Sequence, residues 1–83
     1  MTDEQDRLVT ENIGLVHACA RRYTGRGIDY DDLYQSGCEG LVKAAAGYDS
    51  SRNVRFSTYA VPAILMLLLL LAMAQRVSDM RRS

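Results

Sequence analysis

The sequence has 83 residues, which is enough for one small domain. Ten Lys and Arg residues balance ten Asp and Glu residues, so the net charge of zero argues against an autonomous, strongly basic DNA-binding protein. Cys19 and Cys38, with a single histidine in the chain, match neither a disulfide framework nor the spacing of metal ligands. We expect two small buried thiols in a reducing cytoplasm, and no signal peptide in the acidic start MTDEQDRLVT.

Residues 4–23 are predicted to form an amphipathic helix. The apolar residues that recur there at spacings of three and four are Leu8, Val9, Ile13, Val16, Ala20 and Tyr23. Thr2 and Gln5 have the spacing of a capping box at the helix start. Gly25 and Gly27, on either side of Arg26, are expected to end the helix because glycine adopts positive φ angles without strain.

A second helix is predicted to begin after Asp29, its N-cap, with Asp31 and Asp32 near the positive end of the helix dipole. Its inward face is expected to consist of Leu33, Gly37, Leu41, Ala44, Ala45 and Tyr48. A glycine inside a helix costs about 1 kcal/mol relative to alanine. Gly37 and Gly40 therefore indicate that another helix approaches closely at these positions.

A third helix is predicted after the loop at residues 49–53, capped by Ser57 or Thr58 and bent by Pro62. No alternating strand pattern appears before residue 64. We therefore expect an all-α fold of three helices, in which the first two pack antiparallel and the third crosses them after Ser57.

The sequence offers little for catalysis. His17 has no serine or cysteine partner nearby and is interpreted as a residue of a helix face. Asp29, Asp31 and Asp32 resemble a carboxylate cluster, but capping a helix accounts for them better than binding a metal does. We expect no enzyme, no cofactor and no metal site.

The segment from Arg52 to Tyr59 suggests binding instead. Cationic, hydroxyl and aromatic side chains interleave there, which is typical of a surface that holds an unstacked single strand; these residues are Arg52, Arg55, Phe56, Ser57, Thr58 and Tyr59. In the alternative interpretation, the two aromatic rings belong to the core and the arginines are simply solvated.

Three stretches, in order and at characteristic spacing, resemble region two of bacterial RNA polymerase sigma factors, especially the sporulation-type members. They are ENIGLVHACARRY, GRGIDYDDLYQSGCEGLVKA and NVRFSTYAVP. The resemblance covers residues 8–64. In this family the second helix docks against a coiled coil of the polymerase β′ clamp, and the next segment melts the −10 promoter element.

The resemblance implies residue roles. The implied polymerase-binding positions are Asp32, Leu33, Gln35, Gly37, Cys38, Leu41 and Lys43. Phe56, Thr58 and Tyr59 match positions that stack or pocket an extruded base, and Arg52 and Arg55 match basic positions that would meet phosphates. The implied partners are the polymerase core, promoter −10 DNA weakly and only in complex, and an anti-sigma factor.

Several positions depart from the family pattern. Ser36 stands where many members have glutamate, and Ala46 and Gly47 replace a charged pair. Glu39 replaces an apolar residue. If Glu39 faces the core, an unpaired carboxylate would cost several kcal/mol or stay protonated; if it faces the clamp, binding specificity changes instead.

The largest departure is the apolar run at residues 65–74, where the family has a charged amphipathic helix that contacts promoter duplex. No charged residue occurs from residue 65 up to Arg76, so the −10 recognition surface is expected to be truncated. Residues 60–74 would span about 22 Å as a helix, short of the roughly 30 Å hydrocarbon core of a membrane. Their apolar surface would invite self-association or contact with a membrane surface.

We therefore expect a sigma region-two-like domain at residues 1–64, followed by a leucine-rich helix and short basic tail at 65–83. Loss of an original end by frameshift or truncation is favoured over a purposeful anchor. The expected function is binding of the polymerase clamp in transcription initiation, with residual or no −10 recognition. The alternatives are a non-initiating competitor of sigma or anti-sigma factors, and a degenerate remnant with a membrane-associated helix.

Overall fold

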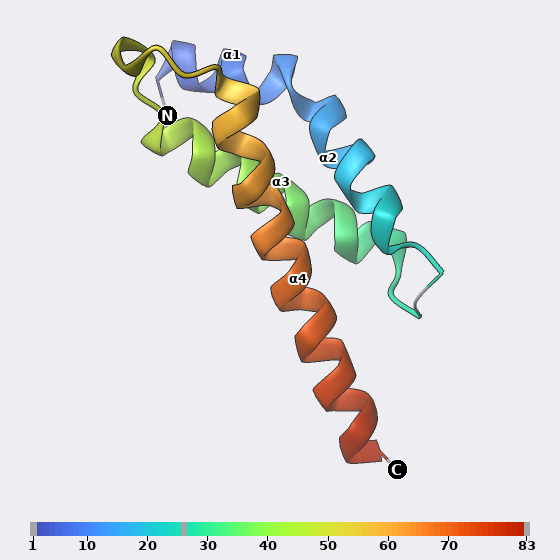
Figure 1. Cartoon of the computed structure of the whole chain (residues 1–83). Coiled ribbons are helices and arrows are strands. Elements are labelled where there is room, and N and C mark those ends of the chain that lie inside the picture. Colours follow the sequence, from blue (N-terminus) through green and yellow to red (C-terminus); the bar gives the residue numbers. More distant parts are fainter. Residues whose placement is uncertain (1, 26, 83) are drawn as a thin grey trace.

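The computed structural model describes residues 2–25 and 27–82, with only the backbone of residue 82. Across these residues the chain is helical and contains no strand, which confirms the all-α prediction. Its α-helices are α1 (Asp3–Glu11), α2 (Ile13–Ala20), α3 (Tyr30–Gly47) and α4 (Phe56–Arg82). Two short 3₁₀ turns, η1 (Arg21–Tyr23) and η2 (Ser50–Arg52), follow α2 and α3 (Figure 1).

The prediction of one continuous first helix is wrong, because the helix divides at Asn12 into α1 and α2. The Asn12 side-chain amide donates a hydrogen bond to the Leu8 carbonyl at 2.8 Å, and its backbone leaves the helical region with φ −117° and ψ 13°. Short polar side chains compete with the helical backbone through such local bonds. The capping box of Thr2 and Gln5 is confirmed at the start of α1.

The turn between α2 and α3 uses its glycines as predicted. Gly25 and Gly27 have φ angles of 84° and 82°, which confirms the expected positive values. Arg26, between them, lies outside the described residues. The α-helix itself ends earlier than predicted, at Ala20, and η1 tightens the last turn before the glycines.

Helix α3 begins after Asp29, as predicted, although the Asp29 side chain makes no capping hydrogen bond. Its buried face is formed by Leu33, Gly37, Gly40, Leu41, Ala44 and Ala45. Tyr48 lies just after the helix and is half-buried, packing against the core. The predicted inward face is therefore confirmed, with Gly40 added to it.

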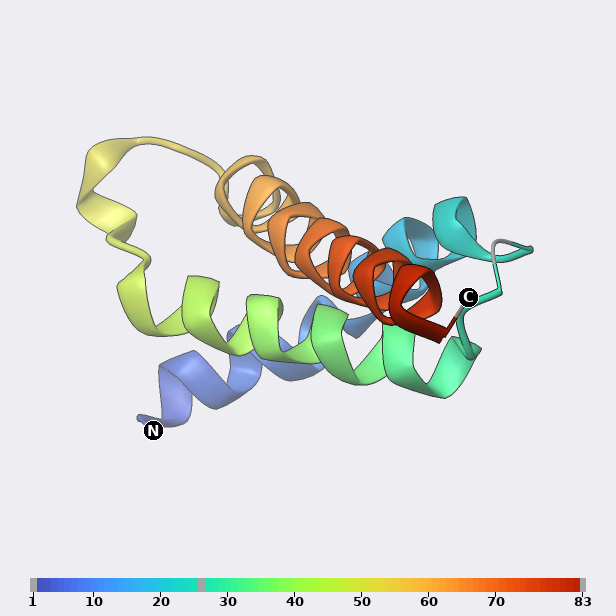
Figure 2. The same ribbon diagram turned by 90° about the horizontal axis from the view of Figure 1, so that it is seen from below.

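The two glycines of α3 allow two different close contacts. A Cβ atom added at Gly40 would lie 2.8 Å from the Ala63 carbonyl oxygen and 2.9 Å from the Ile64 Cα, so α3 and α4 cross backbone to backbone there. At Gly37 the nearest atom is the Val16 Cγ1 of α2, at 2.7 Å. The predicted close approach of another helix is confirmed, and Figure 2 shows α4 lying over α2 and α3.

Helix α4 begins at Phe56, so Ser57 and Thr58 lie inside its first turn and the prediction that one of them caps it is wrong. The Tyr59 amide already donates to the Arg55 carbonyl at 3.3 Å. The helix continues through Pro62 without interruption. It also crosses residues 64 and 65 unbroken, so the apolar run is the continuation of the same helix that enters the core.

The core sits where α2, α3 and the first half of α4 meet. Its largest fully buried side chains are Leu33, Leu41, Ile64, Leu68 and Val16. The second half of α4 projects beyond α1, α2 and α3 (Figure 1), giving the chain an elongated shape of 50 × 20 × 18 Å.

By length and composition alone, α4 is the one helix among the described residues that could cross a membrane. Within Phe56–Arg81, an 18-residue window has a mean hydropathy of 2.2, so the stretch that meets this criterion is longer than the apolar run at residues 60–74. The core helix of a soluble protein meets the same criterion, and Ala60, Ile64 and Leu68 are fully buried against the chain's own core.

Candidate functional site

One side of α3 carries a line of exposed polar residues, which we call the α3 stripe: Asp32, Gln35, Glu39 and Lys43. Their spacings of three, four and four place them on one side of the helix, away from its buried face. Glu39 is exposed and lies 3.6 Å from Lys43, so the alternative that its carboxylate is buried is wrong. An exposed pair of this kind adds little stability, which leaves both charges available to a partner.

The other implied polymerase-binding positions are not on this stripe. Leu33 and Leu41 have no exposed surface, and Gly37 is buried, so these three residues belong to the core of the chain. In this structure they support the position of α3 and cannot touch a partner directly. Cys38 is half-buried and lies on another side of α3.

A group of rings that the sequence analysis did not predict joins α2 to the start of α3. The His17 Nδ1 lies 2.5 Å from the Tyr30 hydroxyl, and the His17 and Tyr34 ring centroids are 4.8 Å apart. Desolvation, together with a hydrogen bond to Cys38, raises the pKa of Tyr34. The four-residue spacing of Tyr30 and Tyr34 was the available signal for this cluster. No group of three metal-ligating side chains occurs among the described residues.

Both cysteines are free thiols, and they differ in exposure. Cys19 is buried as predicted, and burial raises the pKa of its thiol, although the nearby Arg22 opposes this effect. Cys38 is only half-buried, so the prediction of two buried thiols holds for Cys19 alone.

The turn before α4 is shaped by Asp49. Its carboxylate accepts hydrogen bonds from the Ser51 hydroxyl at 2.7 Å and the Ser51 amide at 3.0 Å, and these bonds lower the pKa of Asp49. The same carboxylate lies 3.9 Å from the Arg52 guanidinium, which remains exposed. Asn53 then adopts a left-handed conformation with φ 61°. Arg52 is therefore held at the surface at the entrance to α4.

The two aromatic residues at the start of α4 have different environments. Phe56 is 8% exposed and packs edge-on against Tyr48, with ring centroids 5.2 Å apart. The interpretation of Phe56 as a core residue is therefore correct. Tyr59 is 44% exposed, its ring centroid 6.0 Å from that of Tyr48, so it remains available at the surface.

Tyr59 lines one side of an open pocket of about 460 Å³ between the end of α3 and the start of α4. The lining residues are Gly47, Tyr48, Asp49, Arg52, Val54 and Tyr59. Arg55 and Thr58 are also exposed in the segment that leads into α4. A cation, an aromatic ring and a concave surface thus lie together, an arrangement that suits a nucleic-acid base with its phosphate.

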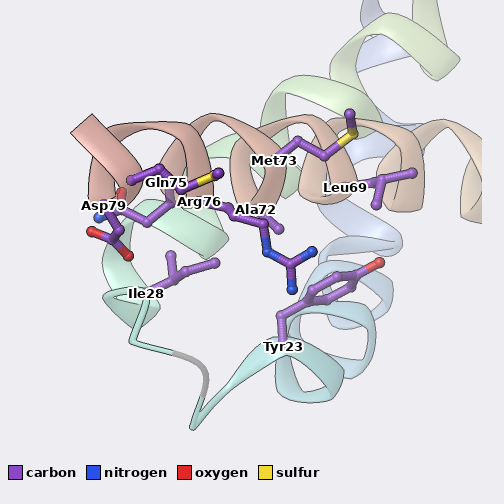
Figure 3. A pocket seen from close by; sticks show the side chains of 9 residues that line it. Tyr23, Ile28, Leu69, Ala72, Met73, Gln75, Arg76 and Asp79 are labelled. Atoms are coloured by element: carbon purple, nitrogen blue, oxygen red, sulfur yellow. The ribbon is translucent and has the colours of Figure 1, made fainter. Parts of the chain in front are cut away.

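A second pocket, of about 440 Å³, lies between the turn after α2 and the second half of α4. Figure 3 shows the side chains of Tyr23 and Ile28 facing those of α4, including Arg76 and Asp79. Leu69 and Met73 border the same pocket. No sequence pattern predicts this pocket, because none brings Tyr23 and Ile28 to α4.

The sequence matches the protein family described as Sigma-70 region 2 over residues 8–77, and the chain belongs to this family. It is 44% identical over 64 residues to the RNA polymerase sigma-G factor of Clostridium acetobutylicum, covering 77% of this chain and 25% of that protein. It is 48% identical over 61 residues to the sigma-F factor of Bacillus licheniformis and to the sigma-G factor of Bacillus subtilis, covering 74% of this chain and 24% of each relative.

The resemblance to sigma-factor region two is thereby confirmed, and the match continues past residue 64 to residue 77. The chain spans about a quarter of the length of these curated relatives. Within it, the structure separates two candidate surfaces: the α3 stripe, and the pocket bordered by Arg52 and Tyr59.

Proposed function

We propose that this chain acts as a sigma-factor region-two unit in transcription initiation and binds the RNA polymerase core through the α3 stripe. The observation that carries the proposal is that Asp32, Gln35 and Lys43, three of the polymerase-binding positions implied by the family, are exposed together on one side of α3. Family membership over residues 8–77 and the names of the relatives, RNA polymerase sigma factors, support this assignment.

Partner recognition on this stripe is polar. Asp32 and Glu39 supply carboxylates, Lys43 supplies an ammonium group and Gln35 supplies an amide that can both donate and accept. Such a surface fits a partner helix with alternating charges, such as the coiled coil of the polymerase clamp. Glu39 lies between Gln35 and Lys43 on this stripe, so we expect it to alter the preference for a clamp rather than the stability of the fold.

Contact with DNA is proposed to be limited to the segment around the Tyr59 pocket. Arg52 and Arg55 would meet phosphates, while Tyr59 and Thr58 would contact an unstacked base. Phe56, being buried, would hold the start of α4 in place rather than stack on a base. No charged residue occurs between Arg55 and Arg76, so α4 has no cation along most of its length for a promoter duplex.

The test is capture of purified polymerase core by the immobilised chain, compared with an Asp32→Ala, Gln35→Ala double variant. Each polar contact contributes about 0.5–1.5 kcal/mol, and about 1.4 kcal/mol is a factor of ten in affinity. We therefore expect the double variant to bind at least about fivefold more weakly. Equal capture of both proteins, each shown to be helical by circular dichroism, would contradict the proposal.

Asp31→Ala is the matched control. Asp31 and Asp32 are both exposed in the first turn of α3, so each substitution removes a similar interaction with the helix dipole. Asp31 lies about 100° around the helix from Asp32 and outside the α3 stripe. We expect capture by Asp31→Ala to equal that of the parent chain, whereas a matching loss would place the contact elsewhere on α3.

The limited DNA segment also favours a second candidate function, competition without initiation. A chain that occupies the clamp and has no basic α4 surface would reduce transcription by an intact sigma factor. Adding the chain to a reconstituted reaction with an intact sigma factor distinguishes the two: competition lowers the amount of transcript, while initiation yields transcript when the chain is the sole sigma factor.

A further inference from the structure

The second half of α4 carries a row of exposed apolar side chains that the proposed function does not use. The large apolar side chains exposed along this part of the helix are Met66, Leu69, Leu70, Met73, Val77 and Met80. We call four of them the α4 seam: Met66, Leu70, Met73 and Val77. These residues are 62%, 54%, 56% and 52% exposed, respectively. Apolar surface of this extent on a helix that projects from its domain is typical of an interface.

The spacing within the α4 seam is four, three and four residues. This alternation averages about 3.5 residues, the period at which apolar side chains stay on one line along a pair of supercoiled helices. The buried face of α4 lies on the other side, since Leu68 is about 200° around the helix from Met66. Leu68 is fully buried in the chain's own core. The α4 seam therefore lies on the side of α4 away from its buried face, with Met73 also bordering the pocket at Tyr23.

We propose that the α4 seam packs against the α4 seam of a second copy of this chain, with the two helices antiparallel. The proposal does not rest on polymerase or DNA binding. A twofold axis makes such a contact self-complementary, because residue i meets residue j and residue j meets residue i. The antiparallel register that pairs all four residues places Met66 beside Val77 and Leu70 beside Met73 of the second copy.

The charges next to the seam select the antiparallel direction. Arg76 directly precedes Val77, and Arg81 lies four residues after Val77, so they flank the seam on its two sides. In a parallel pair, flanking positions five residues apart face each other, which would bring Arg76 of each copy beside Arg81 of the other. Like charges placed this way are unfavourable. In the antiparallel register both arginines lie beside residues 60–69 of the second copy, which hold no charge.

A second copy fits this surface better than a lipid bilayer does. Along residues 60–68 the side of α4 opposite the seam is occupied by the core, so a bilayer could reach only part of the helix circumference there. Asp79 and Arg76 lie within the C-terminal part of the helix, and the chain has no net positive charge to favour an anionic lipid surface.

The expected dimer is weak. Four side chains on about two helical heptads form a contact smaller than the roughly 800 Å² per partner of a standard interface. We therefore expect reversible dimerisation in the micromolar range. Helices α1–α3 of each copy would lie on the outer side of the α4 pair, because they pack on the side of α4 opposite the seam.

Sedimentation equilibrium of the full chain under reducing conditions, over a wide concentration range, tests the proposal. We expect a monomer–dimer equilibrium in the parent, and a dissociation constant at least about tenfold higher for Val77→Glu, because the new carboxylate would be buried at the contact. The matched control is Val42→Glu, which adds the same charge at an exposed position of α3. A monomeric parent, or equal weakening by both variants, would overturn the proposal.

Cysteine crosslinking tests the direction of the helices in a Cys38→Ser background, where Cys19 is buried. A mixture of Leu70→Cys and Met73→Cys chains should form a mixed disulfide faster than either chain links to itself. Preferential self-linking at position 73 would indicate a parallel pair and overturn the antiparallel assignment.

Flotation with vesicles of phosphatidylglycerol and phosphatidylcholine tests the membrane alternative. We expect the parent to remain in solution at concentrations where it dimerises. Binding of monomeric parent to vesicles, lost in Val77→Glu but kept in Val42→Glu, would overturn the dimer as the occupant of the α4 seam.

Discussion

At the scale of single residues, Gly40 sets the distance between the two longest helices. A Cβ at this position would lie 2.8 and 2.9 Å from backbone atoms of Ala63 and Ile64, which cannot rotate away. We expect Gly40→Ala to destabilise the chain by up to about 2 kcal/mol, because overpacking costs about 1–3 kcal/mol and the gain in helix propensity is about 1 kcal/mol. Thermal unfolding should show a melting temperature roughly 4–8 °C lower for each kcal/mol lost.

Gly14→Ala is the control for this substitution. Gly14 lies in α2, and no atom would lie within 4 Å of an added Cβ. The same chemical change should therefore stabilise the chain by up to about 1 kcal/mol through helix propensity alone. If both variants shifted the melting temperature in the same direction, the close crossing at Gly40 would not limit stability.

Single residues also show which features of the structure could be predicted from the sequence and which could not. Helical spacing predicted the buried face of α3, and the cost of internal glycines predicted close approach, because both depend on local chemistry. The sequence could not tell that Gly37 meets a side chain whereas Gly40 meets backbone. From the sequence, Phe56 and Tyr59 received the same interpretation, whereas in the structure both rings lie near Tyr48 but only that of Phe56 is buried.

At the scale of elements, α4 has two halves with different support. Ala60, Ile64 and Leu68 are fully buried, whereas Met73 and Val77 are more than half exposed. In a dilute sample we expect backbone amides around residues 60–68 to exchange with solvent at least about tenfold more slowly than those of residues 74–80, because local opening is easier where few apolar contacts hold a helix. Hydrogen exchange followed by mass spectrometry measures this difference.

The same experiment at high concentration separates the intrinsic stability of α4 from its association. Dimerisation should slow exchange at residues 66–77, and Val77→Glu should abolish that change. Uniform protection along α4 in dilute solution would contradict the division of the helix into a supported and an unsupported half.

The elements also differed in how well the sequence predicted them. The existence of the helices followed from apolar spacing, but the division between α1 and α2 depends on one hydrogen bond of the Asn12 side chain. The start of α4 was misplaced by two or three residues, because hydroxyl residues favour both caps and first turns. The second pocket depends on the placement of Ile28 opposite α4, which no local pattern encodes.

At the scale of the whole molecule, the two proposed surfaces lie on different helices and face away from the contact between those helices. The α3 stripe lies opposite the buried face of α3, and the α4 seam lies opposite that of α4. Binding to polymerase and dimerisation should therefore be independent. We expect monomeric Val77→Glu to capture polymerase core as well as the parent, and Asp32→Ala, Gln35→Ala to dimerise as the parent does.

Capture assays and sedimentation equilibrium on the parent, on Val77→Glu and on the Asp32→Ala, Gln35→Ala variant test this independence, with Asp31→Ala as the control for capture and Val42→Glu as the control for dimerisation. Distant sites without shared contacts usually have additive effects on free energy. A loss of capture in Val77→Glu with an unchanged circular dichroism spectrum would mean that polymerase contacts α4 or requires the dimer. Tighter capture by Val77→Glu would instead mean that the dimer covers the α3 stripe, so that self-association and polymerase binding compete for one molecule.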